Sequence, residues 1–158
     1  MQASEDPHTE AGHPAPLVTE RLHLLRAYRH AWDGRAAEEI SPWLERCWRA
    51  TSSYVNPILD SVRGPQDLAQ VILNYEHLFP DHAIRPTGGV AIHHDLASYR
   101  WCLSSSAPIR LLGHDFGTMI TGYDVVEFDD VGITRVIEFF DGLAQHPAWD
   151  QPPIHQKG

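Results

Sequence analysis

Basic residues are scarce in this chain. Its 158 residues include 12 Lys and Arg against 21 Asp and Glu, which gives a formal net charge of −9. A chain without a basic patch has little to attract phosphate backbones or anionic lipid headgroups. Long apolar runs are lacking too, and none approaches the roughly 20 residues that a membrane-spanning helix needs. We therefore expect neither nucleic acid nor a membrane as a partner.

Cysteine is almost absent as well. Cys47 and Cys102 are the two cysteines of the chain, too few for a disulfide framework, so we expect two ordinary thiols. Histidine occurs 11 times, but no His-x-x-x-His or Cys-x-x-Cys spacing suggests a metal site. We expect no metal and no cofactor. The N-terminus has no charged segment followed by an apolar one, so we expect a cytoplasmic protein.

Composition divides the chain into three parts. Residues 1–16 are polar and rich in proline, without a hydrophobic period, and we expect a disordered tail there. Residues 17–142 carry the periodic patterns of one domain of ordinary size. Residues 143–158 again resemble a tail, although Leu143 and Trp149 are apolar.

Helical patterns come first within the domain. Residues 19–34 form an amphipathic helix with Thr19 as the expected N-cap and Gly34 as the stop. The pattern of residues 36–48 predicts a second helix, with a break near Pro42. After a short strand that ends at Pro57, residues 64–79 predict a third helix.

Strand patterns follow the helices. We expect strands over residues 82–94, 96–106, 117–128 and 132–141, separated by turn-forming segments. Such consecutive hairpins form an antiparallel sheet. Helices followed by a meander of strands indicate the α+β class, with the helices covering one face of a curved sheet.

One acidic residue lies in an unusual place. In the strand that ends in "TGYDVVEFDDVG", side chains alternate between the two faces, so Asp124 shares the apolar row with Ile120, Val126 and Phe128. An acid that faces an apolar interior has its charged form disfavoured, and its pKa rises. Asp124 is therefore a candidate acid or hydrogen-bond donor. The alternative is a charge matched by a structural arginine.

Three segments in this order carry a resemblance to a known family. "AYRHAWDG" in the first helix, "YVNP" before "GPQDLAQVI", and the closing "GYDVVEFDDVGITRVIEFFDG" resemble a SnoaL-like member of the nuclear transport factor 2-like superfamily. The resemblance covers residues 18–142. It implies a cone-shaped α+β fold, in which a bent antiparallel sheet wraps around the N-terminal helices and encloses a deep pocket. It also implies a homodimer.

The resemblance suggests roles for two residues that face the interior. Asp124 corresponds to the acid of the ketosteroid isomerase oxyanion hole and to the acid/base aspartate of SnoaL-type polyketide cyclases. Tyr28 resembles the tyrosine donor of the same oxyanion hole, although a core tyrosine would look alike. Asn56 departs from the isomerase pattern, because an amide replaces the general-base aspartate before a proline.

Limonene epoxide hydrolase is a second relative for comparison. Tyr54 and Asn56 resemble its Tyr-x-Asn pair, which holds a water. Arg100 falls at the position of its arginine, Cys102 replaces one acid, and Glu138 takes the place of the other. Glu138 is then a candidate base with Arg100 orienting it. The alternative is a buried Arg100–Glu138 ion pair that stabilises the sheet.

The remaining candidates are a histidine and two tryptophans. His94 follows Val90 and Ile92 in the alternation of a strand, so it is expected to face inward and to serve as a base, unless it is a solvent-exposed turn residue. Trp32 and Trp101 are expected to line the pocket, as Tyr54, Asn56 and Cys102 are, or to belong to the core.

Taken with the resemblance, these residues predict a cofactor-free isomerase, cyclase or dehydratase for a hydrophobic small molecule, polyketide- or terpenoid-like, in secondary metabolism. Asp124, Tyr28, Glu138, His94 and Arg100 are the catalytic candidates. Epoxide opening is the second enzymatic possibility. A non-catalytic ligand-binding or dimerisation module is the third, because neither relative's catalytic set is complete.

Overall fold

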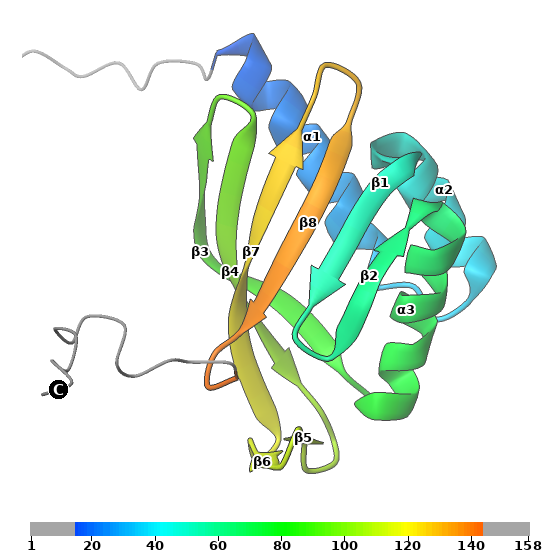
Figure 1. Ribbon diagram of the computed structural model, residues 1–158, viewed down its shortest axis with the longest axis vertical. Coiled ribbons are helices and arrows are strands. Elements are labelled where there is room, and N and C mark those ends of the chain that lie inside the picture. Colours follow the sequence, from blue (N-terminus) through cyan, green and yellow to red (C-terminus); the bar gives the residue numbers. More distant parts are fainter. Residues whose placement is uncertain (1–14, 144–158) are drawn as a thin grey trace, which may run out of the picture.

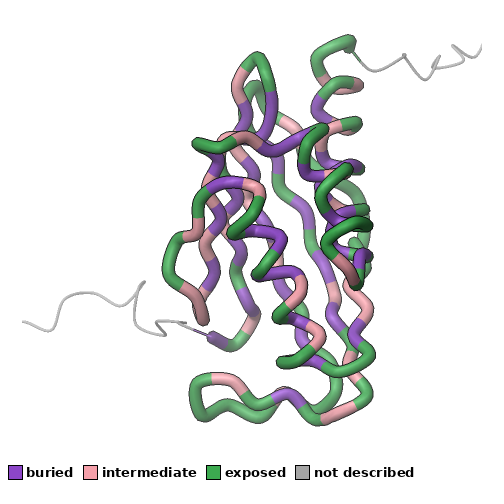
Figure 2. The backbone as a smooth tube through the Cα atoms, turned by 90° about the vertical axis from the view of Figure 1, so that its right-hand side faces the viewer, coloured by how far each residue is buried: buried purple, intermediate pink, exposed green. Residues whose placement is uncertain are grey.

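A computed structural model of the chain describes residues 15–143. A six-stranded sheet forms one layer and three helices form the other, with α1 behind the sheet and α2 and α3 at one end (Figure 1). Buried and exposed residues alternate along the strands, and buried residues also occur in all three helices (Figure 2). The architecture is α+β, as the sequence predicts.

The first helix begins earlier than expected. α1 spans Pro16–Ala31, and Ala15 is the N-cap, without a side-chain hydrogen bond. Thr19 is already inside the helix, since its N–H donates to the Ala15 carbonyl at 3.1 Å. The expectation of a Thr19 cap is therefore wrong. Proline in the first turn has a φ suited to a helix and lacks the N–H that would be unpaired there, so it starts the helix instead.

The other two helices follow their patterns closely. α2 spans Ala37–Cys47 and contains Pro42 without a break. α3 spans Gly64–Leu78, with a proline at its start, and buries its apolar stripe. Pro42 is the middle residue of α2, and the helix continues through it, so the expectation of a break there is wrong.

The strands form one large sheet. They are β1 (Trp48–Asn56), β2 (Leu59–Arg63), β3 (Ala83–His93), β4 (Leu96–Ser104), β7 (Met119–Phe128) and β8 (Ile133–Phe140), arranged in the order β2-β1-β8-β7-β4-β3. The predicted hairpin neighbours β3–β4, β4–β7 and β7–β8 are antiparallel. The pair β1–β8 is parallel, so the sheet is mixed rather than wholly antiparallel.

Three short strands are absent from the sequence-based assignment. β2 pairs with β1, and β5 (Arg110–Leu111) pairs with β6 (His114–Asp115) in a small separate hairpin. Strands of two to five residues are too short for an alternating pattern to indicate them. The two predicted tails lie outside the described residues apart from their edges, where Pro16 belongs to α1 and Leu143 is buried.

Gly122 leaves room for the side chain of Trp101 to lie across the sheet. Gly122 on β7 lies opposite Trp101 on β4 and faces the interior. A Cβ at Gly122 would collide with the Phe139 carbonyl oxygen and with the Trp101 ring. The missing side chain therefore lets the indole lie over β7, from where it reaches Asp124, two residues further along the strand.

We predict that Gly122→Ala destabilises the protein by about 1–3 kcal/mol, the usual cost of an overpacked core. Gly89 offers a matched control, because no atom lies within 4 Å of the position of its Cβ. Gly89→Ala should change stability by less than about 1 kcal/mol. Urea unfolding measures both, and equal effects of the two variants would contradict the close approach.

Candidate functional site

Asp124 is buried inside the molecule, at 3% exposure. The Tyr99 hydroxyl donates to its Oδ2 at 2.7 Å, and the Trp101 indole N–H donates to its Oδ1 at 2.9 Å. Both donors come from β4, whose residues pair directly with β7. Each carboxylate oxygen thus has one donor, which is how a buried acid is satisfied without a cation.

Glu138 lies opposite Asp124 on the neighbouring strand β8. It is also buried, and the hydroxyls of Tyr54 and Tyr75 donate to its two oxygens at 2.9 and 3.1 Å. Tyr54 comes from β1 and Tyr75 from α3. Within residues 15–143, no Lys, Arg or His nitrogen lies within 4.0 Å of either carboxyl group, so neither acid is held in an ion pair.

Asn56 holds the two phenols in place. Its Nδ2 donates to the hydroxyl oxygens of Tyr54 and Tyr75, both at 3.0 Å. Its Oδ1 accepts the backbone N–H groups of Ile58 and Leu59 at 3.0 and 2.9 Å. All the donors and acceptors of the amide are therefore used. Asn56 positions the phenols and closes the turn after β1, and it has no free group to hold a water.

Burial raises the proton affinity of both acids, and the charge of Asp124 raises that of Glu138 further. Burial raises the pKa of Asp124 from 3.8 to about 6, while the hydrogen bonds from Tyr99 and Trp101 and the charge of Arg29 act in the opposite direction. Burial and then the charge of Asp124 raise the pKa of Glu138 well above its usual value. Near neutral pH, Asp124 is therefore largely ionised, and its charge favours the protonated form of Glu138.

A small cavity lies against both acids. Its volume is about 10 Å³, room for about one water molecule. Aromatic and aliphatic side chains form most of its wall, with Asp124, Glu138 and the guanidinium of Arg29 as the polar groups. The expected deep pocket is thus nearly filled by side chains, and Trp32 and Trp101 are among those that line the small cavity that remains.

A larger hollow of about 360 Å³ opens beside this cavity, between α1 and β3. Tyr99, whose hydroxyl binds Asp124, and Arg29 line it. Arg29 also lines the small cavity, and its Nη2 donates to the Ile84 carbonyl oxygen at 2.7 Å across the seam between α1 and β3. Arg29 therefore stands between the acids and the outside.

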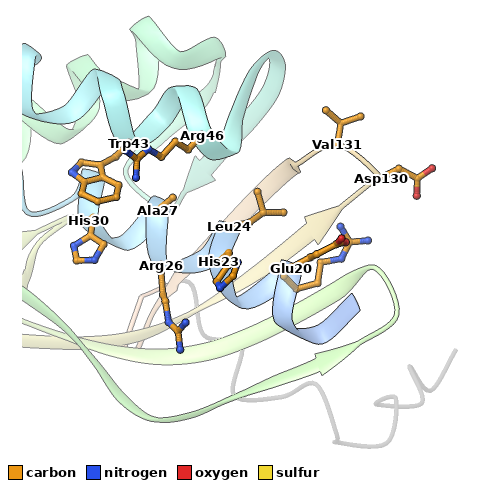
Figure 3. A pocket seen from close by; sticks show the side chains of 11 residues that line it. Glu20, His23, Leu24, Arg26, Ala27, His30, Trp43, Arg46, Asp130 and Val131 are labelled. Carbon is orange, nitrogen blue, oxygen red and sulfur yellow. The ribbon is translucent and has the colours of Figure 1, made fainter. Parts of the chain in front are cut away.

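Another groove, of about 520 Å³, lies on the far side of α1 and does not reach the acids. Figure 3 shows His30, Trp43 and Arg46 at one end of it and Glu20, Asp130 and Val131 at the other. His30 stacks on the Trp43 ring at 4.6 Å, and the Arg46 guanidinium lies 4.6 Å from the same ring. Its polar groups are surface side chains of both signs, so we place the candidate site at the acid pair.

Tyr28 is fully buried, but its hydroxyl meets no hydrogen-bond partner within the described residues. Its ring stacks on Trp48 at 5.8 Å. Burial, followed by the nearby charge of Asp124, raises the pKa of the phenol well above its usual value. The hydroxyl does not contact Asp124, and its role as a second donor stays a prediction.

Arg100 and Cys102 lie on the opposite face of the sheet from the acids. Arg100 is 62% exposed and pairs with Asp141 at 3.2 Å. The inward residues of β4 are Tyr99, Trp101 and Leu103, so the intervening Arg100 and Cys102 face outward by strand alternation. The expectation that Arg100 orients Glu138, or forms a buried ion pair with it, is wrong in this geometry, as is a pocket position for Cys102.

His94 is a second correction. It lies in the turn between β3 and β4, is exposed, and has a φ of 51°. The strand ends at His93, so the alternation that would turn His94 inward does not extend to it. It is the solvent-exposed turn residue of the alternative interpretation, remote from the buried acids.

Three residues of the site were not among the sequence candidates: Tyr75, Tyr99 and Arg29. Tyr99 shares a strand face with Trp101, and this spacing could have indicated it. Tyr75 and Arg29 lie on helices, where only the packing of α3 and α1 on the sheet places them at the acids.

No group of three potential metal ligands occurs within residues 15–143. Among those same residues, no helix has the length and apolarity to span a bilayer.

Solved structures of similar fold are numerous, although no protein-family model and no characterised protein matches the sequence. A SnoaL-like family protein of Agrobacterium tumefaciens, provisionally described as an isomerase, is 25% identical with a TM-score of 0.64, over 78% of this chain and 99% of that one. A provisional SnoaL-like polyketide cyclase of Jannaschia is 17% identical, over 90% of this chain and 100% of that one, with a TM-score of 0.64. TerC, crystallised with polyporic acid, is 13% identical with a TM-score of 0.56, over 75% and 92% of the two chains.

The raised pKa of Asp124 predicts how stability depends on pH. The folded state keeps the proton up to about pH 6, whereas the unfolded chain loses it near 3.8. The unfolding free energy should therefore fall as pH rises through this window. Asp124 alone contributes about 3 kcal/mol to the fall, since each pKa unit corresponds to about 1.4 kcal/mol.

The variant Asp124→Asn mimics the protonated acid and removes this titration. Its stability relative to the wild type should rise between pH 4 and pH 8, measured by urea unfolding. Glu127→Gln, on the outward side of the same strand, is the matched control and should follow the wild-type curve. Parallel curves for wild type and Asp124→Asn would contradict the raised pKa.

Proposed function

Because the chain has the SnoaL-like fold of the nuclear transport factor 2-like superfamily, we propose that it is an enzyme that moves protons on a small, mainly apolar molecule. Isomerisation, dehydration and cyclisation through an enol-like intermediate all fit this chemistry. The observation that supports the proposal is the buried acid pair Asp124–Glu138, in which two carboxyl groups have their pKa values raised and neither is held by a cation. Perturbed acids of this kind gather at catalytic sites.

In this proposal Asp124 and Glu138 have different roles in proton transfer. Asp124, with a pKa of about 6, is largely ionised at neutral pH and acts as the base. Glu138 keeps its proton and acts as the acid or oxyanion donor. This exchanges the roles that the sequence suggested for them, because the charge of Asp124 raises the pKa of Glu138. The phenols of Tyr54 and Tyr75 hold Glu138 in place.

Small-molecule binding is supported by the neighbouring folds. TerC has been crystallised with polyporic acid, and the hollow beside the acid pair is of a size that suits a compact ligand. The substrate enters by this hollow in our proposal. Its reactive atom then displaces the Arg29 side chain to reach Asp124.

Two other functions are less well supported. Epoxide opening needs a water held by Tyr54 and Asn56 and oriented by an arginine, but Asn56 has no free hydrogen-bonding group and Arg100 faces outward. A binding module without catalysis would fit the narrow cavity. It would give no reason for two buried acids without an ion-pair partner, an arrangement that burial makes costly.

A proton-exchange screen tests the proposal. Polyketide- and terpenoid-like ketones incubated with the protein in D2O should include compounds whose α-protons exchange or whose double bonds shift, detected by mass spectrometry. Asp124→Asn should lower that rate by about 10²–10⁴-fold, the usual contribution of a general base. Glu138→Gln should lower it too, whereas Glu127→Gln serves as the matched control. An unchanged rate in Asp124→Asn would remove the residue from the mechanism.

We also propose a homodimer through the outer face of the sheet. Tyr123 and Phe139 stack there at 4.7 Å, and Phe139 is 39% exposed; Leu96 and Met119 are also exposed, toward the two ends of the same face. Exposed apolar side chains on a sheet face favour an interface. Its outward direction leaves the acid pair untouched.

Sedimentation at micromolar concentration should give the mass of a dimer, and Phe139→Glu should give the mass of a monomer because it places a charge in the interface. Leu112→Glu is the control, since Leu112 is 67% exposed in the loop between β5 and β6, away from the large sheet. A monomeric wild type would rule the dimer out.

A further inference from the structure

The inner face of β3 is uncovered. By register, Pro86 lies opposite Trp101 and Val90 opposite Tyr99, so both face inward. Residues 85–91 are nevertheless exposed without interruption, whereas the inward residues of β4 and β7 are buried. The register shifts between Thr87 and Val90 at Gly88 and Gly89, where the space around each glycine is open. β3 and α1 therefore leave the 360 Å³ hollow between them.

The hollow is lined by basic side chains, although the chain as a whole is acidic. Its polar side chains include Arg26, Arg29 and His30, and no Asp or Glu lies among its lining residues. The chain as a whole carries a formal charge of −9. Leu22, Leu25 and Val90 supply an apolar wall. An apolar hollow with basic groups on one side favours a ligand of matching character, apolar with a negative charge at one end.

Arg29 has unused hydrogen-bonding capacity at the inner end of the hollow. Its Nη2 donates to Ile84, but its Nε is buried and has no partner within the described residues. A guanidinium carries five N–H donors in a planar fork that suits the two oxygens of a carboxylate. The side chain also lines the small cavity with Asp124 and Glu138. A ligand bound to Arg29 would lie next to the acid pair.

We propose that Arg29 is a substrate-positioning residue that selects compact apolar molecules bearing an anionic oxygen, such as a carboxylate or an enolate. This inference rests on the proposed function for its location, since it names the substrate class of the same site. The anionic group binds the guanidinium fork while the apolar body lies along Leu25 and Val90. Engaging the ligand also draws Arg29 away from the Ile84 carbonyl and opens the way to Asp124.

Binding of two naphthalene probes tests the inference without a known substrate. 2-Naphthoate carries the anionic group and 2-naphthalenemethanol has the same ring system without charge. The wild type should bind the naphthoate at least tenfold more tightly, measured by calorimetry and by quenching of tryptophan fluorescence. In Arg29→Met this preference should fall below threefold, while binding of the alcohol stays within threefold of wild type. Arg29→Lys, which keeps the charge but not the fork, should retain part of the preference.

Matched controls locate the site. Arg46→Met, in the groove on the far side of α1, should leave both affinities unchanged. Val90→Trp fills the hollow and should weaken both probes at least tenfold, whereas Ala91→Trp, on the outward side of β3, should weaken neither. Circular dichroism and thermal unfolding confirm that each variant is folded.

The inference is overturned if the wild type binds both probes equally or binds neither at millimolar concentration. It is also overturned if Arg29→Met keeps the tenfold preference. Failure of the proposed function has a different outcome: probe binding then depends on Arg29 as described, but the ketone screen in D2O gives no turnover.

Discussion

The interior of this protein is organised around two carboxyl groups that face each other across the β7–β8 pair. Burying two acids side by side costs free energy unless each oxygen has a donor and one acid keeps its proton. The surrounding side chains meet the first condition, and burial together with the charge of Asp124 favours the proton on Glu138. Tyr99 and Trp101 donate to Asp124, Tyr54 and Tyr75 donate to Glu138, and Asn56 holds the two phenols. Even the glycine at position 122 belongs to this arrangement, because it makes room for the indole of Trp101.

The same arrangement connects the fold to its chemistry. Strands β7 and β8 supply the two acids, β4 supplies the two donors to Asp124, and Tyr54 of β1 and Tyr75 of α3 donate to Glu138. Edge strand β3 is exposed over residues 85–91, and its Gly88–Gly89 irregularity adjoins the hollow that leads toward Asp124. Arg29 stands at the junction of hollow and cavity. The buried interior, which raises the pKa values of Asp124 and Glu138, thus adjoins a hollow large enough for a ligand.

Local patterns predicted much of this fold. The alternation in β7 placed Asp124 on the inner face, and the hairpin order of the last four strands is confirmed. The parallel β1–β8 pair was not predictable, since it joins strands far apart in the sequence and carries no turn signal. The predicted inward positions of Arg100 and His94 were wrong. Side chains alternate along β4, so Arg100 faces outward because its neighbour Trp101 faces inward. Strand β3 ends at His93, so the alternation does not extend to His94. The contributions of Tyr75 and Arg29 arise from helix packing, which a linear pattern does not contain.

The central claim is that Asp124 and Glu138 share the interior with raised and separated proton affinities. Carboxyl ¹³C NMR titration of the labelled protein, with Asp124→Asn and Glu138→Gln used to assign the two signals, tests it most directly. The account predicts that the Asp124 signal titrates near pH 6 and that the Glu138 signal titrates at higher pH. It also predicts that removing the charge of Asp124 lowers the pKa of Glu138. Two independent titrations near pH 4, the ordinary range for solvent-exposed acids, would contradict the account.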